Sequence, residues 1–172
     1  MLNAAIDQRH AIFSVVLALA MAAVVGGALY FEYVLGYLPC YLCLLQRTPY
    51  YIGVPVALVA AAAAWLRWPG CITRGGLVIV SLLMAYGAAL SAYHAGVEWG
   101  WWAGPADCGA GTSTGIINDA TDLLGAIDAV TPPSCDEAAL RILGLSLAGW
   151  NVFLSLALAV FAFRVQQIEN EA

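Results

Sequence analysis

The chain has 172 residues, of which 63% are hydrophobic and only 10% are charged, and its formal net charge is −5 at pH 7. Soluble domains carry about 25% charged residues, so this composition excludes an ordinary water-soluble globular domain. We expect the lipid bilayer to be its main surroundings, and we expect no nucleic-acid partner.

Four long apolar segments divide the chain, and each approaches the roughly 20 residues that a helix needs to cross the hydrocarbon layer. Their apolar residues run continuously, whereas a β-barrel would alternate apolar and polar residues. The sequence therefore predicts an all-α membrane protein, a four-transmembrane-helix bundle formed by residues 1–172 as a single domain. The expected spans are approximately 11–31, 43–66, 75–94 and 142–163.

The first apolar segment resembles a signal peptide in one respect, because Arg9 precedes it and small residues surround Met21. Its uncharged run is longer than the usual signal-peptide core of about 7–15 residues. Three further spans also follow it. We therefore expect a retained helix.

The arginines predict the orientation of the spans, since the chain contains no lysine. Four spans place both termini and the connection between the second and third spans on one side, which the positive-inside rule assigns to the cytoplasm. The loops at approximately 32–42 and 95–141 then lie on the outer side. The arginines that carry this argument are Arg9, Arg67, Arg74 and Arg164.

The long outer loop is acidic, and part of it has helical periodicity. Apolar residues recur from Ile116 to Val130 at the spacing of one helix face, with polar residues mostly on the other face. Pro132 and Pro133 would end such a helix just before Cys135. We therefore predict a short amphipathic helix within this outer loop.

Four of the five cysteines fall on the outer side, where thiols can be kept oxidised. Cys40 and Cys43 form a C-x-x-C motif that follows Pro39 and opens the second span. The N–H groups at a helix N-terminus favour a thiolate. We expect Cys43 to be the better-placed thiolate, because Arg47 lies four residues later on the same helix face.

Two polar residues near the outer ends of spans are candidates for ligand binding. The guanidinium of Arg47 has donors that suit the carbonyl oxygen of a quinone, although an interfacial anchor is the alternative. His94 ends the third span and suits a hydrogen bond to a ligand or the transfer of protons. The alternative for His94 is that of a polar residue at the membrane interface without a functional role.

The second cysteine pair, Cys108 and Cys135, lies in the outer loop. Taken alone, a disulfide between them would serve as a staple that stabilises the loop by about 3–4 kcal/mol. Two disulfides near each other can also exchange through thiolate attack. Two further alternatives are a four-helix membrane protein with only structural disulfides, and a metal site formed by the four outer cysteines. We expect no metal, because a second C-x-x-C is missing and the thiolates would face oxidation.

Taken together, these features resemble the disulfide bond formation protein B (DsbB) family. The resemblance rests on four spans, the pattern Pro39-Cys40-x-x-Cys43-x-x-x-Arg47, one cysteine pair in the second outer loop, and the stretch 144–151 at the fourth span. It implies a multi-pass enzyme of the bacterial inner membrane that reoxidises a periplasmic DsbA-like, thioredoxin-fold dithiol oxidase. It also implies that the electrons pass to a membrane quinone, either ubiquinone or menaquinone.

The resemblance further implies a role for each outer cysteine. The partner would attack a Cys108–Cys135 disulfide, and the released Cys135 would form a transient bond with Cys40. Cys43 would then face the quinone as a thiolate near Arg47, until the Cys40–Cys43 disulfide re-forms. The sequence departs from the family pattern at Gln46, where an acidic residue is expected, and at the additional Cys71.

Overall fold

The computed structural model describes residues 2–105 and 134–167 of the chain. Within them, four helices are long and apolar enough to cross a membrane, which confirms the predicted fold class. A two-stranded antiparallel sheet precedes the last helix. The elements are α1 (Leu2–Tyr33), α2 (Tyr41–Trp65), α3 (Gly70–Glu98), β1 (Arg141–Ile142), β2 (Leu145–Ser146) and α5 (Leu147–Gln167).

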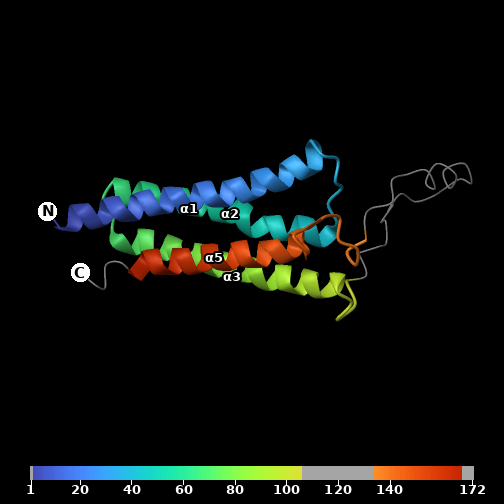
Figure 1. Cartoon of the computed structure of the whole chain (residues 1–172). Helices are drawn as coiled ribbons and strands as arrows, with labels where there is room; N and C mark the ends of the chain where they lie inside the picture. Colours follow the sequence, from blue (N-terminus) through green and yellow to red (C-terminus); the bar gives the residue numbers. More distant parts are fainter. Residues whose placement is uncertain (1, 106–133, 168–172) are drawn as a thin grey trace, which may run out of the picture.

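The helices run side by side as an elongated bundle (Figure 1). The N-terminus and the α2–α3 connection lie at one end of this bundle, and the α1–α2 connection lies at the other end. α2 packs against both α1 and α3, and α5 packs mainly against α3. The core between the helices is apolar, and its fully buried side chains include Leu17, Met21, Ala57, Leu77, Val80, Met84 and Ala162.

Small residues allow the helices to approach closely. A Cβ atom added to Gly76 of α3 would lie 3.0 Å from the Cβ of Ala60 of α2. A Cβ atom on Gly53 of α2 would lie 2.8 Å from the sulfur of Met21 of α1. Because lipid removes most of the hydrophobic driving force between helices, such close packing is a main source of their association.

Three helices begin before their predicted spans, α2 by only two residues and α1 and α3 by more. α1 begins at Leu2, ahead of the expected start at residue 11, and α3 begins at Gly70 instead of residue 75. The added turns contain charged residues such as Asp7, Arg9 and Arg74. Charge limits the part of a helix that sits in hydrocarbon, but it does not end the helix itself.

The fourth span begins later than the sequence predicted, because residues 141–146 form a hairpin. Its turn residues, Leu143 and Gly144, have φ angles of 54° and 85°. Positive φ at both central residues is the backbone of a type I′ hairpin turn. The hydroxyl of Ser146 then accepts a hydrogen bond from the Gly149 N–H at 3.1 Å, so it caps α5, which begins at Leu147.

The expected amphipathic helix from Ile116 to Val130 lies outside the described residues. The chain is described again from Ser134, next to the end of the bundle that holds the α1–α2 connection.

Candidate active site

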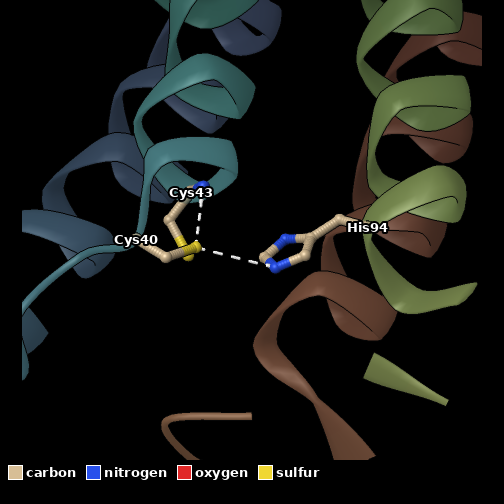
Figure 2. Close-up of side chains that lie close together, drawn as sticks. All are labelled: Cys40, Cys43 and His94. Atoms are coloured by element: carbon tan, nitrogen blue, oxygen red, sulfur yellow. Dashed lines mark hydrogen bonds between the residues drawn. The ribbon is translucent and has the colours of Figure 1, made fainter. Parts of the chain in front are cut away.

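The C-x-x-C motif lies at the start of α2, as the sequence predicted. Cys40 is the N-cap residue, with extended backbone at φ −73° and ψ 170°. Its Sγ accepts a hydrogen bond from the backbone N–H of Cys43 at 3.2 Å (Figure 2). The sulfur thus occupies the position that a serine or aspartate oxygen takes in an ordinary N-cap. We expected Cys43 to benefit most from the helix N-terminus, but the structure places Cys40 in that position.

His94 of α3 faces the motif from across the bundle (Figure 2). Its Nε2 lies 3.6 Å from the Sγ of Cys40, and the residue is only 2% exposed. Packing of α3 against α2 therefore brings together two predicted site residues that are 54 positions apart. His94 is therefore buried beside the thiols of the motif, and a role in ligand binding stays a prediction.

Gln46 holds the other side of the His94 ring. Its Nε2 donates a hydrogen bond to His94 Nδ1 at 2.5 Å. Its Oε1 accepts hydrogen bonds from Ser91 Oγ at 2.9 Å and from Asn151 Nδ2 at 3.0 Å. Two donors on the oxygen set the orientation of the amide, so Nδ1 of His94 is the acceptor. The neutral imidazole therefore carries its proton on Nε2 and donates it to the sulfur of Cys40.

The polar network continues into the bundle. Tyr50 donates a hydrogen bond from its hydroxyl to Asn151 Oδ1 at 2.6 Å, and the same hydroxyl lies 2.7 Å from Ser155 Oγ. The network therefore joins α2, α3 and α5, and it runs from the Cys40 thiol to the apolar core. Buried polar groups that are fully partnered in this way favour one rigid arrangement.

We did not predict this network from the sequence, although the polar residues inside the spans indicate it. Polar side chains inside a membrane span are costly and usually functional. Gln46 and Tyr50 lie one helical turn apart on α2, Ser91 and His94 lie three residues apart on α3, and Asn151 and Ser155 are one turn apart on α5. Each pair therefore shares a helix face.

The electrostatic surroundings favour a thiolate at Cys40. Its pKa is lowered from 9.0 to about 5, first by a hydrogen bond from the Cys43 side chain. Burial acts in the opposite direction, and the hydrogen bond from His94 lowers the pKa further. In the reduced motif the negative charge therefore rests on Cys40, the residue outside the membrane-spanning segment.

Arg47 forms an ion pair with Glu32 near the end of α1. The two side chains are only 13% and 19% exposed, so the pair is largely shielded from solvent. Arg47 and Cys43 border the same cavity, as their common helix face predicted. Arg47 is therefore largely buried at this cavity, and its role in ligand binding stays a prediction.

A cavity of about 460 Å³ opens among these residues, within the range of small-molecule sites. Residues of α1, α2, α3 and α5 line it, together with part of the segment 134–139. The cavity is bordered by Cys40, Cys43, Arg47 and His94. The described residues that we predicted for ligand binding therefore all line the same cavity. Apolar side chains such as Val24, Phe31, Leu147 and Leu154 form much of the remaining wall.

The remaining cysteines occupy distinct positions. Cys135 is disulfide-bonded and 1% exposed, and it belongs to the same buried cluster as Cys40. Cys40 and Cys43 are free thiols, so the motif is in its reduced form. Cys71 is free and exposed at the start of α3, at the opposite end of the bundle. Cys108 lies outside the described residues.

Comparison with known proteins identifies similar chains. A family model described as disulfide bond formation protein DsbB matches residues 9–165. A protein named disulfide bond formation protein B from Polaromonas sp. is 32% identical over 83% of this chain and 82% of its own length. Disulfide bond formation protein B 1 from Pseudomonas putida is 33% identical over 89% of this chain and 88% of its own. No solved structure matches the chain.

Proposed function

The chain belongs to the DsbB family of membrane proteins for disulfide bond formation, and from this premise we propose that it is a quinone-dependent protein thiol oxidase. It takes electrons from a periplasmic DsbA-like oxidase of the thioredoxin fold and passes them to a membrane quinone. The observation that carries this proposal is the cavity between α1, α2, α3 and α5, which meets the reduced C-x-x-C motif directly.

The lining of the cavity supports a quinone as the electron acceptor. Its walls are largely apolar, which suits a ring that enters from the bilayer. Arg47 borders it with guanidinium N–H donors, and a quinone ring presents carbonyl oxygens that accept hydrogen bonds. Ubiquinone and menaquinone both have this chemistry, so both are candidates.

The electron balance of the reaction is simple. Oxidation of Cys40 and Cys43 forms one S–S bond and releases two electrons and two protons, as for any thiol–disulfide couple. The quinone takes up the same electrons and protons and becomes a quinol. Because the pKa of Cys40 is lowered to about 5, its proton has already passed to the solvent near neutral pH, and the quinol takes up a matching proton from the solvent.

The position of Cys135 supports the transfer of oxidising equivalents to the partner protein. In our proposal, a thiolate of the partner attacks Cys108 in a Cys108–Cys135 disulfide, and Cys135 leaves as a thiolate. Cys135 then attacks Cys40 of the oxidised motif, and Cys43 becomes the thiolate that faces the quinone. Cys135 and Cys40 belong to one buried cluster, so the attack of Cys135 on Cys40 needs little movement of the chain.

The proposed setting is the bacterial inner membrane. Both termini would then lie in the cytoplasm, and Cys40, Cys43 and the segment with Cys135 would face the periplasm. The exposed Cys71 would lie on the cytoplasmic side, away from the reaction.

Anaerobic quinone reduction tests the proposal. Purified full-length protein in lipid nanodiscs receives a reduced DsbA-like protein and a ubiquinone or menaquinone analogue, and quinone absorbance is followed. We expect turnover that disappears when any of Cys40, Cys43, Cys108 or Cys135 is replaced by serine. Cys71→Ser is the matched control and should retain full activity.

Absence of turnover with both quinones and an active partner, with the protein correctly folded, would contradict the proposal. Turnover that persists in Cys40→Ser would contradict the assignment of the motif. A protein with only structural disulfides would show neither quinone reduction nor a mixed disulfide with the partner.

A further inference from the structure

The reduced motif and His94 form a compact set of soft metal ligands. The Sγ atoms of Cys40 and Cys43 and one ring nitrogen of His94 all lie within 4.8 Å of one another. Cys40 and His94 are buried, and Cys43 is half-buried. Two thiolates and an imidazole are the ligands that zinc prefers in proteins.

The separation between Cys40 and His94 fits a shared zinc ion. Zinc binds sulfur at about 2.3 Å and imidazole nitrogen at about 2.0–2.1 Å, so two such ligands at a tetrahedral angle are about 3.6 Å apart. The distance from Cys40 Sγ to His94 Nε2 is 3.6 Å. Little movement of either side chain is therefore needed.

Glu98 provides an independent observation, because it is a buried carboxylate with a free oxygen. Its side chain is 5% exposed, and its Oε1 lies 3.8 Å from His94 Nε2. Among the residues that the structure describes, its Oε2 has no hydrogen-bond partner. A buried carboxylate oxygen is costly to leave unpaired. Tetrahedral zinc needs a fourth ligand, and Glu98, whose carboxylate lies beside the His94 ring, is the candidate that a small side-chain movement would bring to the ion.

We propose that the reduced form of this protein binds one zinc ion through Cys40, Cys43 and His94, with Glu98 as the fourth ligand, and that the ion blocks reoxidation of the motif. Binding displaces the remaining thiol protons and moves no electrons. Coordination to zinc occupies a lone pair on each sulfur, so it slows formation of the S–S bond and electron transfer to a quinone. The zinc site stands on the geometry alone, whereas the block rests on the proposed function.

Gln46 makes this site weaker than it would otherwise be. A zinc-bound His94 coordinates through Nε2 and carries its proton on Nδ1, which then needs an acceptor. In the structure Gln46 presents its N–H to Nδ1, so its amide must turn over when the metal binds. A carboxylate at position 46 would accept that proton directly, and carboxylate–histidine–zinc arrangements commonly strengthen metal sites. Gln46→Glu should therefore raise the zinc affinity.

Zinc titration of the full chain tests the site. The protein in nanodiscs is reduced anaerobically, freed of reductant, and titrated with zinc chloride against a coloured zinc chelator. We expect one zinc per chain, and we expect the affinity to fall at least tenfold when the motif is oxidised. Cys40→Ser and His94→Ala should each lower the affinity at least tenfold, and Glu98→Gln should lower it by a smaller factor.

Matched controls separate this site from other thiols and histidines of the chain. Cys71→Ser and His10→Gln should leave the zinc affinity within twofold of the parent protein. Unchanged affinity in Cys40→Ser, or its loss in Cys71→Ser, would overturn the proposal. A gain in affinity for Gln46→Glu cannot result from misfolding, so it protects the test against unstable variants. Equal affinity in Gln46→Glu and the parent would count against zinc coordination by His94.

The blocking effect has its own measurement. Zinc should inhibit quinone reduction by the parent protein, and Gln46→Glu should be inhibited at a lower zinc concentration. Because zinc binding is measured without quinone or partner, a protein that binds zinc but never turns over would contradict the proposed function alone. Turnover with no zinc binding would contradict the zinc site alone.

Discussion

Gln46 of α2 donates a hydrogen bond to Nδ1 of His94 of α3, and so leaves the Nε2 proton of His94 facing the sulfur of Cys40. This arrangement connects the second turn of α2 with the last turns of α3. It also makes the protonation of the active-site thiol dependent on a buried amide that never touches the sulfur. Gln46 is in this sense a positioning residue.

Replacing Gln46 with leucine should leave several buried polar groups without partners. Ser91, His94 and Asn151 each lose a hydrogen bond to this side chain. A buried polar group that loses its partner costs about 1–3 kcal/mol. We therefore expect Gln46→Leu to lower the unfolding free energy by about 1 kcal/mol or more. Denaturant unfolding in detergent measures this change. Thr48→Leu, an exposed change on the same helix, should stay within about 0.5 kcal/mol of the parent protein.

The reactivity of Cys40 should depend on pH in a way set by its lowered pKa. A thiol with a pKa of about 5 is already a thiolate at pH 7, and its reactivity falls as the pH drops through about 5. His94→Phe removes a group that lowers this pKa, so the midpoint should move upward. Mass spectrometry of alkylated, reduced protein follows Cys40 directly, with Cys71 as an internal reference. A midpoint near the ordinary value of 9.0 in the parent protein would contradict the assignment.

Arg47 should act on the quinone more than on the partner protein. We expect Arg47→Ala to raise the KM for quinone about tenfold or more, because a charged hydrogen bond to a carbonyl contributes about 1.5–3 kcal/mol. The KM for the reduced partner should change far less. Steady-state kinetics with each substrate varied in turn gives both values.

Glu32 provides the matched control for Arg47, since the two form one ion pair. Glu32→Gln keeps the guanidinium in the cavity and removes only its counter-charge. Equal increases of both KM values in Arg47→Ala, or the same quinone effect in Glu32→Gln, would assign Arg47 a purely structural role.

Cys43 should be required for quinone reduction but not for capture of the partner. Cys43→Ser removes the thiol that closes the motif disulfide, so quinone turnover should be abolished. The cysteine pair of the outer loop should still form a mixed disulfide with the partner, visible by non-reducing electrophoresis. Retained turnover in this variant would exclude the proposed route through the motif.

Ser146 should stabilise the start of α5. Its hydroxyl accepts the Gly149 N–H, and removal of such a cap typically costs about 1 kcal/mol. Ser146→Ala should therefore lower the unfolding free energy by about that amount, whereas Ser146→Asp should restore most of it. Thermal unfolding of the three proteins gives the comparison. A neutral Ser146→Ala would show that the hydrogen bond contributes nothing measurable.

The start of α5 shows that hydropathy predicts a span better than it predicts the first residue of the helix. The apolar run from residue 142 predicted a helix, yet Leu143 and Gly144 form a hairpin turn, and helix α5 begins only at Leu147. Hydropathy detects the span, but hydrogen bonding at the cap decides where it begins. Gly144 and Ser146 were the available local signals.

The sequence by itself determined the number of spans, the place of the C-x-x-C motif at a helix start, and the set of candidate residues, because these depend on local composition and on neighbours along the chain. Tertiary structure alone decided that His94 faces Cys40, that Gln46 orients His94, and that Arg47 pairs with Glu32. These contacts join residues from different helices. Their geometry follows from how close small residues let the helices pack, and no spacing within a single helix encodes it.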